Sequence, residues 1–323
     1  MGWRSEFSNV ESSATGADGP TPALRWLLSA IGANRLIGLG EIHGSATQHE
    51  LIRELISHPE FAADDLVIEF GNALYQDVLD AYISGEGVPL EQLNRIWRDT
   101  TQSPINTWED PIPTQLLATV REANLAGAHL RVLAGDPPID WQKVQKVEDW
   151  LSFLTDRDSH YASVVETEVL GRGRRGLLLI GGMHLLRKEP IGVGARFPDM
   201  PIIMPHGGYG VLNEEVEAVM AEWPIPSISR VAGTPLAGFT MAHLNSQVFD
   251  HEGKPAQFPP WRWDQLFDYY LYLSPRATLR RSTVAASYEP GFRAELTRRR
   301  EFASRLPPPP QRPSSEQRRP DAG

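Results

Sequence analysis

Short apolar runs alternate with amphipathic segments along most of the chain. The runs predict buried strands at residues 35–39, 65–70, 129–134, 176–180, 201–204 and 269–274. Between them, apolar residues spaced three and four apart predict helices at residues 23–33, 45–57, 74–83, 90–97, 114–124, 141–154, 161–170, 213–223 and 291–304. Ser45 is placed to cap the second of these helices. Strands and helices that alternate with short connections predict an α/β fold with a mainly parallel central sheet and helices on both faces.

The same pattern predicts one folded domain with two polar ends. We expect residues 21–304 to form a single α/β domain. Residues 1–20 are polar and rich in small side chains, and residues 305–323 form a proline-rich tail, so we expect both to be disordered. The less regular stretch 84–113, which holds Trp97 and Trp108, is predicted to form a helical insertion that caps a site.

Composition narrows the classes of function. The 323-residue chain has a net charge of −10, which argues against a nucleic-acid or anionic-membrane partner. No run approaches the roughly 18 apolar residues of a membrane span, and the first residues lack the apolar core of a secretory signal, so we expect a cytoplasmic protein. The absence of cysteine excludes thiolate nucleophiles, iron–sulfur clusters and thiolate zinc sites. A transition metal would therefore need His, Asp or Glu ligands.

Two segments share the pattern G-x-x-H, namely Gly40-Glu41-Ile42-His43 and Gly181-Gly182-Met183-His184. Each follows a predicted buried strand. Because ligands in open α/β sheets bind beyond the carboxyl ends of the strands, both histidines are candidates for a site. Side chains two residues apart in an extended segment point the same way, so Glu41 and His43 could form an acid–base pair or ligate a metal. The alternative is a loop histidine that forms local hydrogen bonds.

Acidic and basic residues follow other strands at the same edge. Glu69 follows three aliphatic residues, where an unpaired carboxylate is costly to bury, although a structural salt bridge would also explain it. Asp136 ends another strand but precedes two prolines, so a turn-forming role is equally favoured. Arg187 lies just beyond His184 and could polarise a substrate carbonyl. We keep His49, Arg53 and His206 as secondary candidates, for which a structural role is favoured.

These residues resemble a superfamily that joins the erythromycin esterases, the ChaN-like haem-uptake domains and the TraB/Tiki proteases. The resemblance spans about residues 34–275. It rests on the two G-x-x-H segments, the helix bearing His49, Glu69, and the segments 121–136 and 267–275. One residue separates Glu41 from His43, which is closer to the ChaN-like branch, since erythromycin esterases usually place two there. The resemblance implies a parallel sheet flanked by helices, with polar residues gathered at the strand ends.

Three functional hypotheses follow. The first is a hydrolase of an ester, lactone or amide in a small-molecule or peptide substrate. His43 would activate water as a general base or as a ligand of a divalent metal (Mn, Co, Zn or Fe), and Glu41, Glu69, His184 and Arg187 would complete the site. The second, implied by the ChaN-like branch, is a haem- or iron-binding protein. The third is a natural-product tailoring enzyme that uses the same site.

Overall fold

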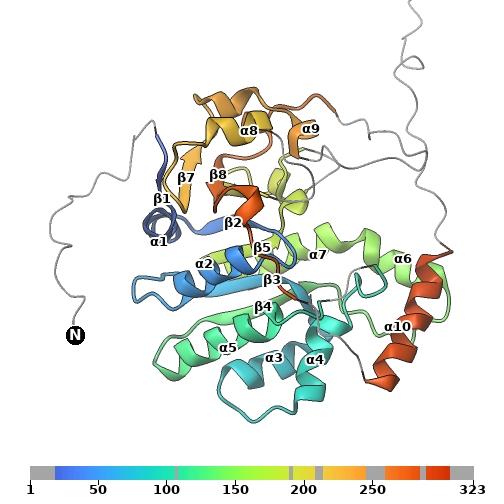
Figure 1. The fold of residues 1–323 in the computed structure, drawn as a ribbon. Coiled ribbons are helices and arrows are strands. Elements are labelled where there is room, and N and C mark those ends of the chain that lie inside the picture. The colour runs from blue at the N-terminus through green and yellow to red at the C-terminus, as the bar shows by residue number, and fades with distance from the viewer. Residues whose placement is uncertain are drawn as a thin grey trace, which may run out of the picture.

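An eight-stranded sheet forms the centre of the computed structural model (Figure 1). The structure describes residues 19–105, 108–188, 192–207, 214–244, 259–283 and 289–305. The strands are β1 (Thr21–Pro22), β2 (Leu36–Glu41), β3 (Asp65–Asn72), β4 (Arg131–Asp136), β5 (Gly176–Gly181), β6 (Ile202–Pro205), β7 (Ser227–Arg230) and β8 (Tyr269–Tyr272). The helices are α1 (Ala23–Ala33), α2 (Ala46–Ile56), α3 (Gln76–Ile83), α4 (Leu90–Arg98), α5 (Ile112–Leu125), α6 (Val147–Thr155), α7 (Arg157–Val164), α8 (Glu214–Val219), α9 (Met241–Leu244) and α10 (Pro290–Ala303).

The strands follow the order β1-β7-β8-β6-β2-β5-β3-β4. Pairing is parallel from β8 through β4, whereas β7 runs antiparallel to both of its neighbours. This confirms the predicted mainly parallel α/β sheet. The sequence did not predict β1, which is a two-residue edge strand, or its neighbour β7, because both are short and have little apolar pattern of their own.

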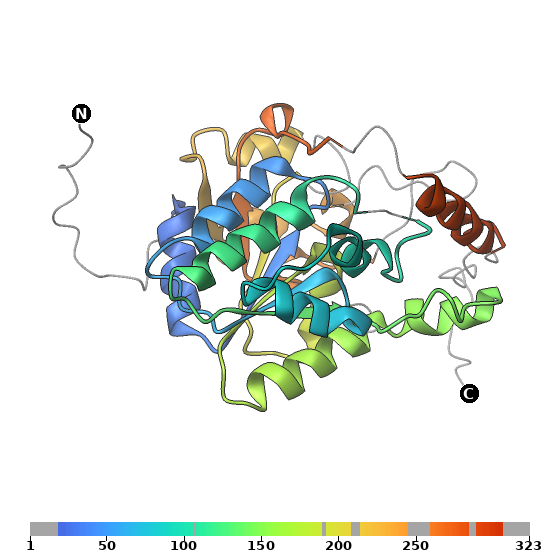
Figure 2. The same ribbon diagram turned by 90° about the horizontal axis from the view of Figure 1, so that it is seen from below.

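Two apolar cores lie on opposite faces of the sheet, as the strand periodicity requires. In β5, Leu177 and Leu179 join the core beneath α1, α2, α3 and α5. Leu178 and Ile180 face the other core, with α7 and the π-helix Val165–Leu170. Figure 2 shows helices on both sides of the strands. All four side chains are fully buried, which explains why this strand reads as a continuous apolar run.

Most predicted helices are present, with shifted ends. Ser45 caps α2 as expected, because its hydroxyl accepts a hydrogen bond from the Gln48 amide at 3.3 Å. The helix predicted for residues 141–154 begins only at Val147, so its first half is wrong. There, Trp141 packs with Trp150 and Phe302 in a small separate core, and tertiary burial explains the apolar spacing.

Three further boundaries differ from the prediction. The helix expected at residues 161–170 begins at Arg157 and becomes a π-helix from Val165. The helix expected at residues 213–223 ends at Val219, and residue 213 lies outside the described residues. The segments 1–18 and 306–323, which cover most of the two ends predicted to be disordered, also lie outside them. In the part of the chain that the structure describes, no helix is long and apolar enough to cross a membrane.

Candidate functional site

The first G-x-x-H segment forms the turn from β2 into α2. Two hydrogen bonds from Gln48 hold its backbone: the side-chain amide donates to the Gly40 carbonyl at 2.6 Å, and its oxygen accepts from the Ile42 amide at 2.7 Å. Gly44 then takes a φ of +73°, a conformation that few side chains tolerate. The turn therefore fixes His43 just beyond the carboxyl end of β2.

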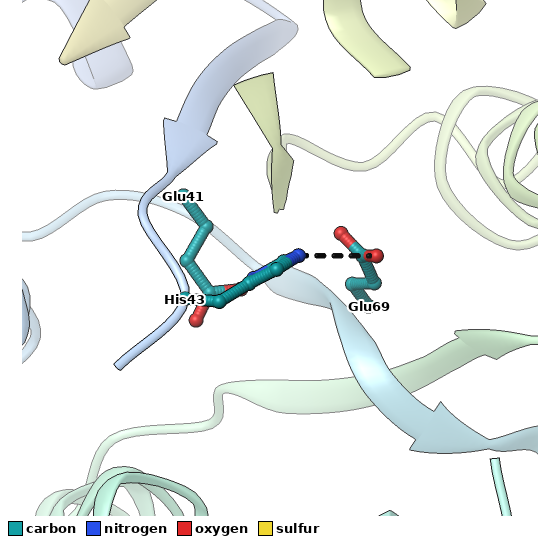
Figure 3. A group of neighbouring side chains, drawn as sticks. All are labelled: Glu41, His43 and Glu69. Atoms are coloured by element: carbon teal, nitrogen blue, oxygen red, sulfur yellow. Dashed lines mark ion pairs between the residues drawn. The ribbon is translucent and has the colours of Figure 1, made fainter. Parts of the chain in front are cut away.

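His43 lies between two buried carboxylates. Its Nδ1 is 3.7 Å from Glu41 Oε2, and its Nε2 is 3.6 Å from Glu69 Oε1. Figure 3 shows the imidazole directed at Glu69. The His43 side chain keeps 12% of its surface exposed, whereas both carboxylates have none. The predicted Glu41–His43 proximity is confirmed, and His43 is the partner of this group that solvent reaches.

Glu69 is the most heavily bonded member of the group. It lies where the register between β3 and β4 shifts, between Ile68 and Asn72. Its carboxylate accepts hydrogen bonds from the side chains of Gln102 and Arg157 and from the backbone amide of Gly181. Burial raises its pKa, but the charges of two histidines and Arg157 outweigh this and hold the pKa at about 2. Glu69 is therefore an anion throughout the physiological pH range.

The second motif has a glycine at position 181 because two side chains of the site leave little room for a β-carbon there. A β-carbon there would lie 3.0 Å from Glu69 Oε2 and 3.3 Å from His43 Cε1. Because such contacts are tighter than side chains normally accept, glycine allows the β5 backbone to approach the two side chains. The β5 backbone at Gly181 therefore lies close to the side chains of Glu69 and His43.

The second motif brings His184 to the same carboxylate. His184 follows β5 on a short 3-10 turn (Gly182–Leu185), and its Nε2 is 3.7 Å from Glu69 Oε1. Its Nδ1 is 2.5 Å from Asp158 Oδ1. The side chain is 25% exposed. Two partly exposed imidazoles thus converge on one buried carboxylate, and each is backed by a second carboxylate.

A third histidine completes the arrangement from inside. His49 of α2 is fully buried, and its Nε2 is 2.8 Å from Glu41 Oε1. Burial raises the pKa of Glu41, but the two histidines lower it further, so that the net shift is downward. Burial lowers the pKa of His43, but the charges of Glu69 and Glu41 outweigh this and raise it overall. His43 and the two carboxylates, Glu41 and Glu69, therefore support each other's charged forms.

The stretch predicted to form a cap supplies two of the surrounding side chains. Trp108 is buried and lies edge-on to the His43 ring, with ring centres 4.4 Å apart. Gln102 from the same stretch reaches Glu69. These contacts agree with a capping role for residues 84–113, which stays a prediction.

The other predicted site residues lie outside this group. Arg187 forms an ion pair with Asp268 at 2.6 Å, and Arg53 donates to Gln115 at 2.7 Å. His206 is buried between Tyr270 and Glu217. Among the described residues, no hydrogen bond, ion pair or ring contact joins any of the three to Glu41, His43 or Glu69.

Asp136 lies one side chain away from Glu69. It is the last residue of β4 rather than the residue after it, and it accepts hydrogen bonds from the amide and hydroxyl of Thr101, both at 2.6 Å. Its Oδ1 is 3.5 Å from Nε of Arg157, which also bonds Glu69. Arg157 therefore links the two acids, and the sequence alternative of a simple turn residue is not what the structure shows.

Sequence reasoning missed Arg157, Asp158 and Gln102. The first two are neighbours at the start of α7, where Arg157 pairs with Glu69 and Asp158 with His184. Gln102 comes from the irregular stretch after α4. Polar residues at a helix start or in a loop carry no periodic signal, so only their placement reveals these roles.

The donor set fits a divalent cation in part. Glu41, His43 and Glu69 each offer a ligand atom, and these atoms lie within 4.8 Å of one another. Glu41 Oε2 is buried and accepts no hydrogen bond from the described residues, which leaves it available as a ligand atom. Glu69, by contrast, already bonds a guanidinium. Carboxylate and imidazole donors suit Zn, Mn, Fe or Co.

Comparison with known proteins yields only distant structural likenesses. No family model matches the chain, and no curated protein matches it. An erythromycin esterase, a mutant of EreC in its open conformation, is 12% identical with a TM-score of 0.47 over 77% of this chain and 92% of that one. The type III effector HopBA1 is 15% identical with a TM-score of 0.41 over 61% and 91%. RRSP, a MARTX toxin effector domain from Vibrio vulnificus, is 17% identical with a TM-score of 0.39 over 56% and 35%.

At these scores the likenesses carry no conclusion about the site. The sequence predicted a resemblance to three groups of proteins. Of these, an erythromycin esterase is among the structurally similar proteins. The closer relation to the ChaN-like branch stays a prediction.

Proposed function

We propose that this protein is a hydrolase of an ester, lactone or amide. One observation carries the proposal: His43 Nε2 and His184 Nε2 lie 3.6 and 3.7 Å from the same oxygen of Glu69. Both rings are also partly exposed, with 12% of the His43 side chain and 25% of the His184 side chain accessible, so a water or substrate can reach them. Two imidazoles facing one point form a general acid–base pair.

His43 would act as the base. As water attacks the carbonyl carbon, a proton passes from the water to Nε2, and the imidazolium formed is stabilised by Glu41 and Glu69. The bond to the leaving oxygen or nitrogen then breaks, and His184 gives that atom a proton. The products are a carboxylic acid and an alcohol or amine. A proton moving from His43 to His184 past Glu69 restores the starting state.

Asp158 supports this assignment of His184. A carboxylate on Nδ1 fixes the tautomer and orientation of an imidazole, which here holds Nε2 toward Glu69 and the reacting groups. The buried position of Glu69 supports the other half, because a fixed anion in a low-dielectric setting stabilises positive charge on either ring.

A metal-assisted form of the reaction is a second candidate, favoured by the unbonded Oε2 of Glu41. Glu41, His43 and Glu69 would hold the ion, which when bound lowers the pKa of water and polarises a carbonyl. Elemental analysis of the purified protein, wild type and Glu41→Gln, tests this form. About one Mn, Co, Zn or Fe per chain that is lost in the variant supports it. A Soret band in the absorption spectrum would instead support the haem hypothesis.

The hydrolase proposal is tested with a panel of ester, lactone and amide substrates. His43→Ala and His184→Ala should each lower kcat by at least about a hundredfold, in line with acid–base catalysis. His129→Ala, an exposed histidine, is the matched control and should leave kcat unchanged. Thermal unfolding should stay cooperative in all three. Turnover at the wild-type rate in both site variants would refute the proposal.

A further inference from the structure

A short buried loop after α4 carries two of the contacts that shape the site. Residues 99–103 are all buried. In this loop Gln102 donates to Glu69, and Thr101 donates twice to Asp136 at 2.6 Å. The position of the loop therefore decides whether Glu69 keeps its hydrogen bond from the Gln102 side chain.

Arg299 of the terminal helix α10 holds this loop at both ends. At the start of the loop its guanidinium donates to the Arg98 carbonyl at 2.8 Å and to Asp99 Oδ1 at 2.7 Å. At the end of the loop it donates to the Ser103 hydroxyl at 2.9 Å. Arg299 is 3% exposed and also stacks over the Trp141 ring at 4.7 Å. A single side chain, 200 residues from Asp99 in the sequence, thus joins the two ends of the loop.

The rest of α10 makes few apolar contacts with the body. Its buried side chains are Leu296, Arg299 and Phe302, and Phe302 packs into the small core of Trp141 and Trp150. An open pocket of about 740 Å³ is lined by residues of both α4 and α10. Figures 1 and 2 show α10 beside α6, at the end of the molecule away from α1. Arg299 is therefore the main polar tie between this helix and the loop.

We propose that Arg299 is a positioning residue for the reaction at Glu69 and acts through the 99–103 loop by keeping Gln102 on that carboxylate. The inference rests on the proposed function. Arg299 touches none of the reacting groups, so it sets the geometry of Glu69 and takes no part in proton transfer. Buried charge-assisted hydrogen bonds of this kind are costly to lose. Asn72, Trp141 and Trp150 donate to the carbonyls of residues 99–101, and Arg299 adds the tie that reaches Ser103 beyond Gln102.

Hydrogen exchange tests the placement of the loop without an activity assay. The Thr101 amide is bonded to Asp136, so its exchange reports the loop directly. Arg299→Met should raise exchange in peptides covering the loop at least tenfold and leave β3 and β5 protected. Arg299→Lys, which keeps the charge but reaches one end of the loop, should give an intermediate rise. Arg300→Met, at the next and exposed position, is the control and should match the wild type.

Kinetics test the link to the site. Arg299→Met should lower kcat at least tenfold with a smaller change in KM, because the loop acts on Glu69 and not on the substrate. Combined with Gln102→Met, it should lower kcat no further than Gln102→Met alone, whereas a merely structural role would add. Should Arg299→Met not fold, Ser103→Ala replaces it, since it removes one of the ties.

The outcomes separate the two claims. Unchanged loop exchange in Arg299→Met overturns the inference whether or not hydrolysis is found. Raised exchange with an unchanged kcat also overturns it. A third outcome is raised exchange in Arg299→Met together with a wild type that hydrolyses nothing in the panel. This outcome supports the role of Arg299 in positioning Gln102 and refutes the hydrolase proposal.

Discussion

Asp136 should make the stability of this protein fall as the pH rises toward 7. The side chain is fully buried, and burial raises its pKa to about 7 from an ordinary value of 3.8, although Arg157 and Thr101 act in the opposite direction. Near pH 6 the folded protein therefore holds a proton on Asp136 that the unfolded chain has lost. Folding takes up one proton at this residue between these two pKa values.

The size of the effect follows from that single proton. Because the pKa is raised on folding, the stabilisation is complete below the unfolded pKa and is lost as the pH passes through the folded one. Uptake of one proton lowers the free energy of unfolding by about 1.4 kcal/mol for each pH unit of increase. From pH 5 to pH 8, Asp136 should therefore remove roughly 2–3 kcal/mol.

Urea unfolding at pH 5, 6, 7 and 8 measures this in the wild type and in Asp136→Asn, which keeps the shape without the charge. Relative to the wild type, the variant should gain roughly 2–3 kcal/mol across that range. Asp80→Asn, at an exposed position of α3, is the control and should run parallel to the wild type. A constant difference between Asp136→Asn and the wild type would refute the reasoning, since it would mean that Asp136 is ionised in the folded protein.

Two other substitutions test the core and the site. Leu179→Ala, in the middle of β5 with no exposed surface, should lower the free energy of unfolding by about 2–5 kcal/mol, whereas Leu125→Ala, 66% exposed, should change it by less than about 0.5 kcal/mol. Equal effects in urea unfolding would contradict the placement of β5. Gly181→Ala should lower kcat at least tenfold, because its methyl group would press on Glu69 Oε2 and the His43 ring, while unfolding changes little. Wild-type kinetics in this variant would show that the two side chains are free to move aside.

Local sequence signals were enough for the parallel sheet and for half of the site. The run Leu177–Ile180 is apolar on both faces because helices cover both sides of β5. A strand of this kind can be identified from its own sequence, without knowledge of the strands that pair with it. Glu41 and His43 lie two residues apart at a strand end, so their proximity follows from backbone geometry alone. The same reasoning placed Glu69 and His184 at the edge where parallel strands end.

Strand order and side-chain reach were decided only by the tertiary structure. Glu69 meets His184 because β5 lies between β2 and β3, an order that no local pattern encodes. Arg187, three residues after His184, turns to Asp268 instead of the site. A long flexible side chain can reach several partners from one backbone position, so its spacing in the sequence does not fix its direction.

The sequence by itself determined which segments are buried and where polar groups leave the strands, because these follow from periodicity along the backbone. Arg157 at Glu69, Asp158 at His184 and Arg299 at the 99–103 loop were decided by the fold alone. Each is a charged residue on a helix, where solvent exposure is the usual outcome. Only the packing of distant elements supplies the carboxylates and other hydrogen-bond acceptors that offset the cost of burying Arg157 and Arg299.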